Sequence, residues 1–192
     1  MADILRYLTH PQVEIVPGIP VPQWGLSKIG TRRIQNLSAS SALANTKRVV
    51  SSGETKAIEV AEILAYSLGV TFEIHEGMHE NDRSSTGFLE STAFEKMAGR
   101  FFTNPEMSVE GWEPASAAQT RIVSEAEVLL ASHAEGDLLI VGHGAVGTLL
   151  YCHFANLPID RKYDQMAGGG NFFAMDIASQ QILYHWRAME EM

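Results

Sequence analysis

The chain alternates between two hydrophobic periods, and this alternation predicts strands and helices in turn. Short runs that are wholly apolar, or apolar at every second position, predict strands, whereas apolar residues three and four positions apart predict helices. In chain order these patterns predict a strand over Ile4–Thr9, a helix from Ser27 to about Gln35, a strand over Lys47–Ser52, a helix over Gly53–Leu68 that Gly69 ends, a strand over Val70–His75, helices over Thr92–Thr103 and Ser116–His133, a strand over Leu138–Val141, a helix over Ala145–Phe154, and strands over Asn171–Asp176 and Gln181–Trp186.

Strands that alternate with helices are typical of a three-layer α/β/α sandwich with a mostly parallel sheet. We find no repeat and no linker, so residues 1–192 are expected to form a single domain. Two segments interrupt the pattern and are expected to be ordered lid insertions: the proline-rich segment 13–25 and the segment around 81–112. The last two strands are expected to pair as a hairpin.

The stretch Asp137–Leu150 carries the strongest local signal for a binding site. An apolar strand ends in Gly142-His143-Gly144, and a helix begins directly afterwards. The first N–H groups of such a helix have no partner within it and point beyond the strand end, which is a geometry that binds anions. Gly144 has no side chain to block a ligand, so His143 is expected to face a bound anion there.

Polar residues follow the other predicted parallel strands as well. The first strand leads into His10, the second ends at Ser51 and Ser52, and the third leads into the loop that carries Glu80. Since the carboxyl ends of parallel strands meet at one edge of a sheet, these side chains are expected to lie near His143. Two histidines, a cation and a carboxylic acid at one site suit phosphoryl transfer: an imidazole attacks phosphorus, positive groups hold the oxygens, and the acid protonates the leaving oxygen.

Five segments of the chain follow one another in a recognisable order. They read YLTHPQ over 7–12, LSKIG over 26–30, SSGETKAIEVA over 51–61, MHE over 78–80 and VGHGA over 141–145. This order resembles the histidine phosphatase superfamily, which has the phosphoglycerate mutase-like fold. Its corresponding motifs are Arg-His-Gly, Leu-Ser/Thr-x-x-Gly, Ser-Ser-Pro-Leu-x-Arg-Ala, Leu-x-Glu and His-Gly-Gly. The resemblance extends over nearly the whole chain and implies that fold.

The resemblance also implies a role for each matching residue. His10 would be the nucleophile that becomes phosphohistidine, His143 the second pocket histidine, and Glu80 the proton donor to the leaving group. Lys56 would replace a phosphate-binding arginine. The residues expected to bind the phosphate are Thr9, Lys56, Arg83 and Gly144. The implied activity is that of a metal-independent phosphomonoester hydrolase or phosphotransferase without a cofactor, which acts on a small phosphorylated substrate or binds free phosphate.

The chain departs from the family pattern at both arginines. Thr9 stands where the arginine beside the nucleophile is expected, and a hydroxyl or a lysine cannot offer the bidentate fork of a guanidinium to phosphate. Arg83, three residues after Glu80, is the candidate for a compensating cation. The alternative is a catalytically degenerate protein of the same fold that binds a phospho-ligand or regulates. Asp82 remains the competitor of Glu80 as the acid.

Other interpretations of the same residues remain open. Gly142-x-Gly144-x-x-Gly147 satisfies the dinucleotide-binding fingerprint, although it comes late in the chain. His10, His143 and Glu80 are of types that bind metals, but no His-x-x-x-His helix pattern accompanies them. Ser51 and Ser52 are expected to cap the following helix.

The net charge, the apolar runs and the single cysteine argue against several classes of partner and location. The formal net charge of −9 argues against nucleic acid and against anionic membrane surfaces as partners. No apolar run is long enough to span a membrane and no signal segment is evident, so we expect a cytoplasmic protein. Cys152 is the only cysteine, which excludes an intrachain disulfide. A homodimer is an open alternative to a monomer.

Overall fold

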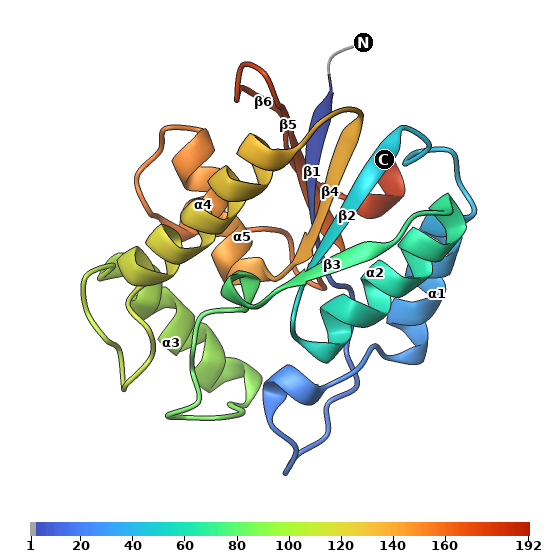
Figure 1. The fold of residues 1–192 in the computed structure, drawn as a ribbon. Coiled ribbons are helices and arrows are strands. Elements are labelled where there is room, and N and C mark those ends of the chain that lie inside the picture. Colours follow the sequence, from blue (N-terminus) through green and yellow to red (C-terminus); the bar gives the residue numbers. More distant parts are fainter. Residues whose placement is uncertain (1–2) are drawn as a thin grey trace.

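The computed structural model describes residues 3–192, which form one six-stranded sheet covered by helices (Figure 1). The strand order is β3-β2-β4-β1-β5-β6. The strands are β1 (Ile4–Thr9), β2 (Thr46–Ser52), β3 (Phe72–His75), β4 (Asp137–Gly142), β5 (Asn171–Asp176) and β6 (Ile182–Ala188), and the α-helices are α1 (Lys28–Ser38), α2 (Thr55–Leu68), α3 (Ser91–Thr103), α4 (Ala115–Ser132) and α5 (Gly144–Phe154).

Four strands of the sheet run parallel, and two run as an antiparallel extension. β2 pairs in parallel with both β3 and β4, and β4 pairs in parallel with β1. β5 then pairs antiparallel with β1, and β6 antiparallel with β5. The mostly parallel sheet and the terminal hairpin are therefore confirmed.

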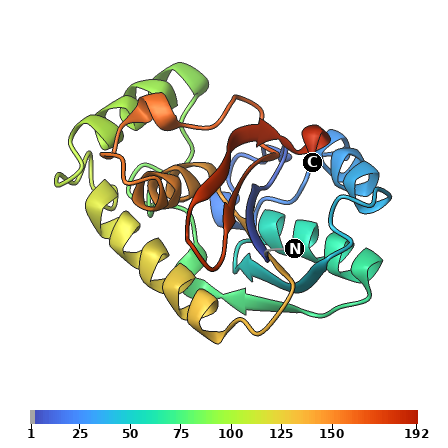
Figure 2. The same cartoon turned by 90° about the horizontal axis from the view of Figure 1, so that it is seen from above.

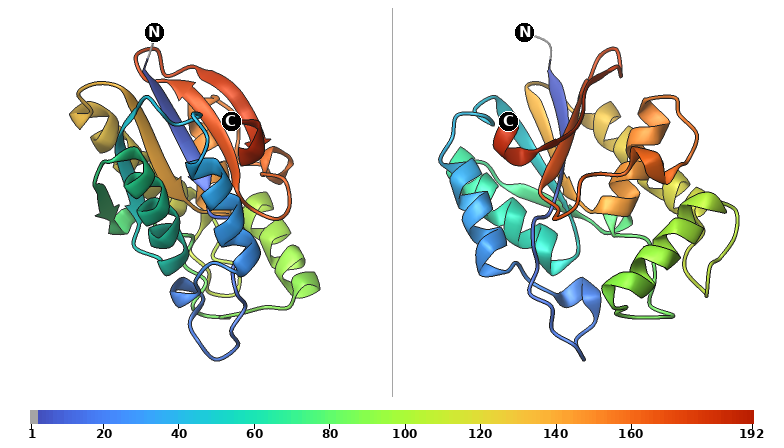
Figure 3. Two further views of the ribbon diagram at one scale, coloured as in Figure 1. Left: turned by 90° about the vertical axis from the view of Figure 1, so that its right-hand side faces the viewer. Right: turned by 180° about the vertical axis from the view of Figure 1, so that it is seen from behind.

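Helices cover both faces of the sheet, which confirms the three-layer α/β/α arrangement (Figures 2 and 3). On β4, Leu138 and Ile140 belong to the core under α3, α4 and α5, whereas Leu139 and Val141 belong to the core under α1 and α2. Because successive strand residues point to opposite faces, an apolar run buried on both sides is what a central strand requires. This run is why β4 lies in the middle of the sheet.

Local signals fix several element ends where they were expected. The Ser27 hydroxyl accepts a hydrogen bond from the Gly30 N–H at 3.2 Å and caps α1. Gly69 adopts the left-handed conformation, with φ of 68°, and ends α2. Val70 still bonds to Ala65 of that helix, so β3 begins only at Phe72, two residues later than predicted.

The four parallel strands end at the edge of the sheet that the two lid segments cover. Segments 13–25 and 81–112 both lie beyond this edge, and the rings of Trp24 and Phe88 connect them with a centroid distance of 5.4 Å. The edge therefore brings His10, Ser52, Glu80 and His143 to one side of the molecule. Within residues 3–192, no helix is both long and apolar enough to cross a membrane.

Candidate active site

The two histidines of the predicted site lie next to each other. His10 follows β1 and His143 follows β4, and these strands pair in parallel up to Thr9 and Gly142. The centroids of the two imidazole rings are 5.3 Å apart, and the ring planes are inclined by 66°. Both rings can therefore contact one phosphoryl group at the same time.

The backbone fixes the orientation of His10. Its Nδ1 lies 2.8 Å from the Pro11 carbonyl oxygen, which can only accept, so Nδ1 carries the proton and Nε2 keeps its lone pair. Burial lowers the pKa of His10 to about 4. The hydrogen bond to Pro11 raises the pKa and the positive charge of Lys56 lowers it, but burial has the largest effect. His10 is therefore a neutral imidazole at neutral pH, with the free nitrogen that a nucleophile needs.

His143 is completely buried and its side chain is partly unpaired. Nε2 lies 2.6 Å from the Ser52 hydroxyl, whereas the buried Nδ1 has no hydrogen-bond partner among residues 3–192. Burial lowers the pKa of His143 to about 4, although the neighbouring Glu54 carboxylate opposes the shift. His143 is therefore a neutral imidazole at neutral pH and supplies no positive charge to the site before a ligand binds.

The backbone of His143 is anchored by Tyr7. The phenol group accepts a hydrogen bond from the His143 N–H at 3.0 Å and lies 3.1 Å from the His143 carbonyl oxygen, to which it donates. Tyr7 is fully buried on β1, and its burial raises the pKa of the phenol far above the usual range. Tyr7 thus positions the second histidine without titrating itself, and sequence patterns gave no signal of this role.

Glu80 lies over the N-terminus of α5. Its carboxylate accepts hydrogen bonds from the backbone N–H groups of Ala145 at 3.2 Å and Val146 at 3.1 Å. The helix-terminal anion site predicted after Gly144 therefore exists, but a carboxylate of the protein itself occupies part of it. Arg121 of α4 holds the Glu80 segment in place by donating to the backbone carbonyls of Gly77 at 2.7 Å and His79 at 2.9 Å.

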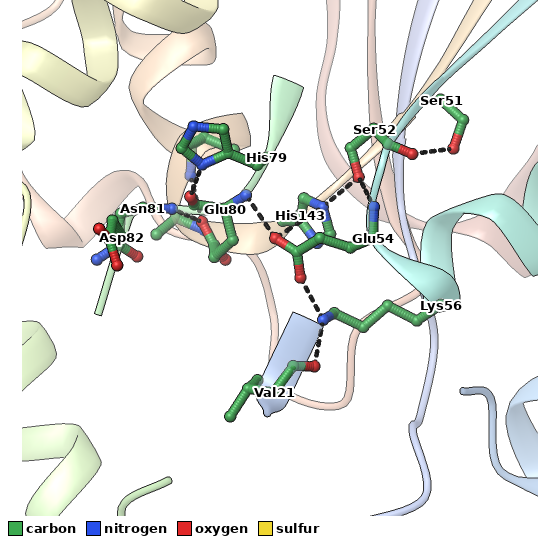
Figure 4. A network of polar contacts seen from close by, with 12 residues as sticks. Val21, Ser51, Ser52, Glu54, Lys56, His79, Glu80, Asn81, Asp82 and His143 are labelled. Atoms are coloured by element: carbon green, nitrogen blue, oxygen red, sulfur yellow. Dashed lines mark hydrogen bonds and ion pairs between the residues drawn. The ribbon is translucent and has the colours of Figure 1, made fainter. Parts of the chain in front are cut away.

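Lys56 reaches the site, but an acidic residue neutralises it there. The Lys56 ammonium forms an ion pair with the carboxylate of Glu54, and it also donates to the Val21 carbonyl oxygen of the first lid segment at 3.0 Å (Figure 4). Both side chains are buried, with exposed fractions of 3% for Lys56 and 7% for Glu54. The sequence analysis missed Glu54, although it stands where the family pattern has leucine.

Glu54 connects three parts of the site. Besides Lys56, its carboxylate accepts a hydrogen bond from the Glu80 N–H at 2.8 Å and lies 3.5 Å from Nε2 of His143. Burial alone would raise the pKa of Glu54, but the charges of His143 and Lys56 and the hydrogen bonds outweigh burial and hold the pKa at about 2. Glu54 is therefore negatively charged at any physiological pH.

The hydroxyl of Thr9 is not available to a phosphate, which corrects its assignment as a phosphate-binding residue. Thr9 is fully buried, donates to the side-chain oxygen of Gln165 at 2.7 Å, and accepts from the Asn171 N–H at 3.0 Å. These bonds join the end of β1 to the start of β5. Thr9 stabilises the sheet next to the nucleophile instead of binding the ligand.

The serines at the end of β2 also differ from the prediction. The Ser51 hydroxyl donates to the Ser52 carbonyl oxygen at 2.9 Å, and Glu54, not a serine, precedes the first residue of α2. The Ser52 hydroxyl accepts from the Glu54 N–H at 3.3 Å and contacts His143. Ser52 therefore holds His143 rather than capping α2 from the N-cap position.

A cavity of about 440 Å³ opens in front of His10. Glu80, Arg83 and Gly144 line it, as do two polar residues that sequence analysis missed, Asp164 and Gln165. Four aromatic residues of the second lid segment also line it: Phe94, Phe101, Phe102 and Trp112. Burial raises the pKa of Asp164. The Arg83 guanidinium stacks on the Phe94 ring, 4.9 Å from its centroid, and it forms no ion pair within residues 3–192.

Packing explains the glycine pattern that resembled a dinucleotide fingerprint. A β-carbon on Gly142 would lie 2.2 Å from the Tyr7 hydroxyl oxygen, and one on Gly147 would lie 2.4 Å from the Tyr7 ring. A β-carbon on Gly144 would lie 2.4 Å from the side-chain nitrogen of Gln165. These glycines make room for Tyr7 and Gln165. In the part of the chain that the structure describes, no three His, Cys, Asp or Glu residues are placed to hold a metal ion.

Comparison with known proteins identifies relatives of this fold. A family model described as histidine phosphatase superfamily (branch 1) matches residues 20–172, which include Lys56, Glu80 and His143 but not His10. No curated protein matches the sequence. Among solved structures, the mycobacterial glucosyl-3-phosphoglycerate phosphatase has a TM-score of 0.74 at 18% identity, and 97% of each chain is covered.

Two further solved structures are similar over most of their length. The YhfR protein of Bacillus stearothermophilus has a TM-score of 0.79 at 17% identity, with 94% of each chain covered. A putative alpha-ribazole-5'-P phosphatase of Escherichia coli has a TM-score of 0.70 at 17% identity, with 98% of this chain and 96% of that chain covered. At these identities the similarity establishes a common fold.

Proposed function

Since the chain belongs to the histidine phosphatase superfamily, branch 1, we propose that it hydrolyses a small phosphomonoester through a phosphohistidine at His10. In the first step Nε2 of His10 attacks phosphorus, a P–N bond forms, and the ester P–O bond breaks. The leaving oxygen takes a proton from Glu80. Water then attacks phosphorus and gives a proton to the Glu80 carboxylate, and the P–N bond breaks, so that phosphate is released and both His10 and Glu80 are restored.

One observation carries this proposal: the free Nε2 of a neutral His10 that lines the cavity, with the buried ring of His143 beside it. The Pro11 carbonyl oxygen holds the proton on Nδ1, and the lowered pKa keeps the ring unprotonated. The Nδ1 of His143, on a ring whose centroid is 5.3 Å from that of His10, is a buried polar atom without a partner among the described residues. A buried polar atom of this kind favours a bound ligand that completes its hydrogen bonding.

Positive charge for the phosphoryl oxygens would come chiefly from Arg83. It lines the cavity together with His10 and is free of ion pairs within the described part of the chain. Lys56 is close to the site, but it shares its charge with Glu54. The guanidinium of Arg83 would thus take over part of the role of the arginine that Thr9 replaces.

The walls of the cavity favour an apolar or aromatic leaving group. Val13 and Ile15 line it from the first lid segment, and Phe94, Phe102 and Trp112 line it from the second. Apolar walls around a few polar groups are typical of small-molecule sites. An aryl phosphate is therefore a suitable test substrate.

A labelling experiment tests the proposal. Incubation with an aryl phosphate labelled at phosphorus should give an acid-labile, base-stable phosphoprotein, and His10→Ala should abolish both the label and turnover. His153→Ala is the matched control, because His153 is exposed on α5 away from the cavity. Full hydrolysis by His10→Ala would assign the nucleophile to another residue.

The alternative is a protein of this fold that binds a phospho-ligand without turnover. Two observations favour it: the Thr9 hydroxyl is hydrogen-bonded to Asn171 of β5, and Lys56 forms an ion pair with Glu54. Both leave fewer free cations than a phosphoryl-transfer site ordinarily uses. Saturable binding of inorganic phosphate or vanadate, combined with no phosphohistidine and no hydrolysis, would favour this alternative.

A further inference from the structure

Most of the positive charge near the candidate site is neutralised before any ligand binds. Lys56 is paired with the carboxylate of Glu54, whereas Arg83, which lines the cavity, forms no ion pair among residues 3–192. Arg161, which also lines the cavity, is paired with Glu95. His10 and His143 are neutral above their pKa of about 4. Among the described residues that line the cavity, Arg83 is therefore the one cation left unpaired for an anion, and a second negative charge on that anion is costly in a partly dehydrated pocket.

Breaking the ion pair between Lys56 and Glu54 to let Lys56 bind a ligand would cost free energy. Both side chains are more than nine-tenths buried, so moving Lys56 toward a phosphate would leave the Glu54 carboxylate buried without its cation. The same carboxylate is held by the Glu80 N–H at 2.8 Å and lies 3.5 Å from Nε2 of His143. Glu54 is thus fixed beside the histidine that a phosphoryl group would contact (Figure 4).

We propose that Glu54 is a specificity-determining residue, and that it restricts this site to phosphoryl groups that carry a single negative charge. The substrate class is then a singly ionised phosphate ester, and a doubly ionised one is disfavoured by the fixed carboxylate. This inference rests on the proposed function of the same site. The inference specifies which ionic form of the phosphoryl group the site accepts, because the ion pair with Glu54 already neutralises Lys56.

Other charged and titratable groups face Glu54 and have to be separated from its effect. Glu76, His79, Asp82 and Arg83 line the adjoining cavity of about 630 Å³ together with Glu54. The test therefore needs one anion that changes its charge with pH and another that does not. Inorganic phosphate changes from singly to doubly charged, whereas sulfate stays doubly charged, so sulfate reports any effect of the protein groups alone.

The experiment measures binding of phosphate and sulfate by calorimetry on both sides of the second ionisation of phosphate, from about pH 5.5 to about pH 8.5. The wild-type protein should bind singly charged phosphate about ten-fold or more tightly than doubly charged phosphate, and sulfate weakly throughout. Glu54→Gln keeps a similar shape and frees the charge of Lys56. It should raise the affinity for sulfate and for doubly charged phosphate by about ten-fold or more.

Glu62→Gln is the matched control, since it removes a carboxylate from the exposed side of the same helix α2 and should leave all affinities unchanged. Binding of phosphate by Glu54→Gln alone would contradict the proposal, because the wild-type site would then reject the singly charged form as well. Equal wild-type affinity for both ionic forms of phosphate, an unchanged affinity in Glu54→Gln, or no binding by either protein would overturn it. The experiment measures affinity only. Its outcome is therefore independent of turnover and of the phosphohistidine label at His10, which test the proposed function.

Discussion

Acid should destabilise this protein through His143, because the folded state holds this side chain neutral. Burial lowers the pKa of His143 from 6.5 to about 4, so the unfolded chain binds more protons than the folded chain between these pH values. The free energy of unfolding therefore falls as the pH is lowered through this window. The effect fades as the pH rises above 6.5, since His143 then becomes neutral in both states.

The magnitude follows from the two pKa values. Their difference of 2.5 pH units, at about 1.36 kcal/mol per unit, sets an upper limit of about 3.4 kcal/mol. With the same values, the loss amounts to about 0.8 kcal/mol at about pH 6, about 2 kcal/mol at about pH 5 and about 3 kcal/mol at about pH 4. The loss from Glu54 falls at lower pH, because its carboxyl takes up a proton only near its pKa of about 2.

Urea unfolding of the wild type and of His143→Gln at about pH 7, 6, 5 and 4 would measure this contribution. His143→Gln should be less stable at neutral pH because a buried side chain changes, but the difference from wild type should shrink by about 3 kcal/mol toward about pH 4. His153→Gln on the exposed side of α5 is the control and should follow the wild type. Parallel curves for wild type and His143→Gln across this range would refute the reasoning.

Three other substitutions test the site by different measurements. Arg83→Ala should weaken binding of inorganic phosphate by about ten-fold, the scale of one charged hydrogen bond. The control Arg100→Ala removes a cation that pairs with the exposed Glu110 and should leave the affinity unchanged. Equal affinities of Arg83→Ala and the wild type would exclude Arg83 as a phosphate-binding residue. Tyr7→Phe should lower the free energy of unfolding in urea by about 1–3 kcal/mol, since it leaves the buried His143 N–H unpaired; an unchanged stability would contradict this anchoring role. Arg121→Gln should lower kcat for an aryl phosphate more than it changes KM, because it releases the Glu80 segment, and a change in KM alone would argue against positioning of the acid.

The fold was predictable from the sequence because each decisive signal is local. The apolar run on β4 requires burial on both faces, the Ser27 cap and Gly69 fix the ends of helices, and alternating strands and helices give parallel pairing. Parallel pairing in turn brings the polar residues at the strand ends to one edge. For this reason His10 and His143 could be placed together before the structure was known.

The electrostatics of the site were decided only by tertiary structure. Lys56 was expected to offer a free positive charge to the phosphate, but it forms an ion pair with Glu54. Thr9 was expected to offer a hydroxyl, but this hydroxyl is hydrogen-bonded to Gln165 and Asn171. Glu54 precedes α2, Gln165 follows α5 and Asn171 begins β5, and no local pattern predicts which side chains meet. A pKa or a free cation depends on distance and burial, because desolvation and Coulomb interaction both act across space. The sequence thus determined which groups reach the site, and packing determined which of them are already paired there.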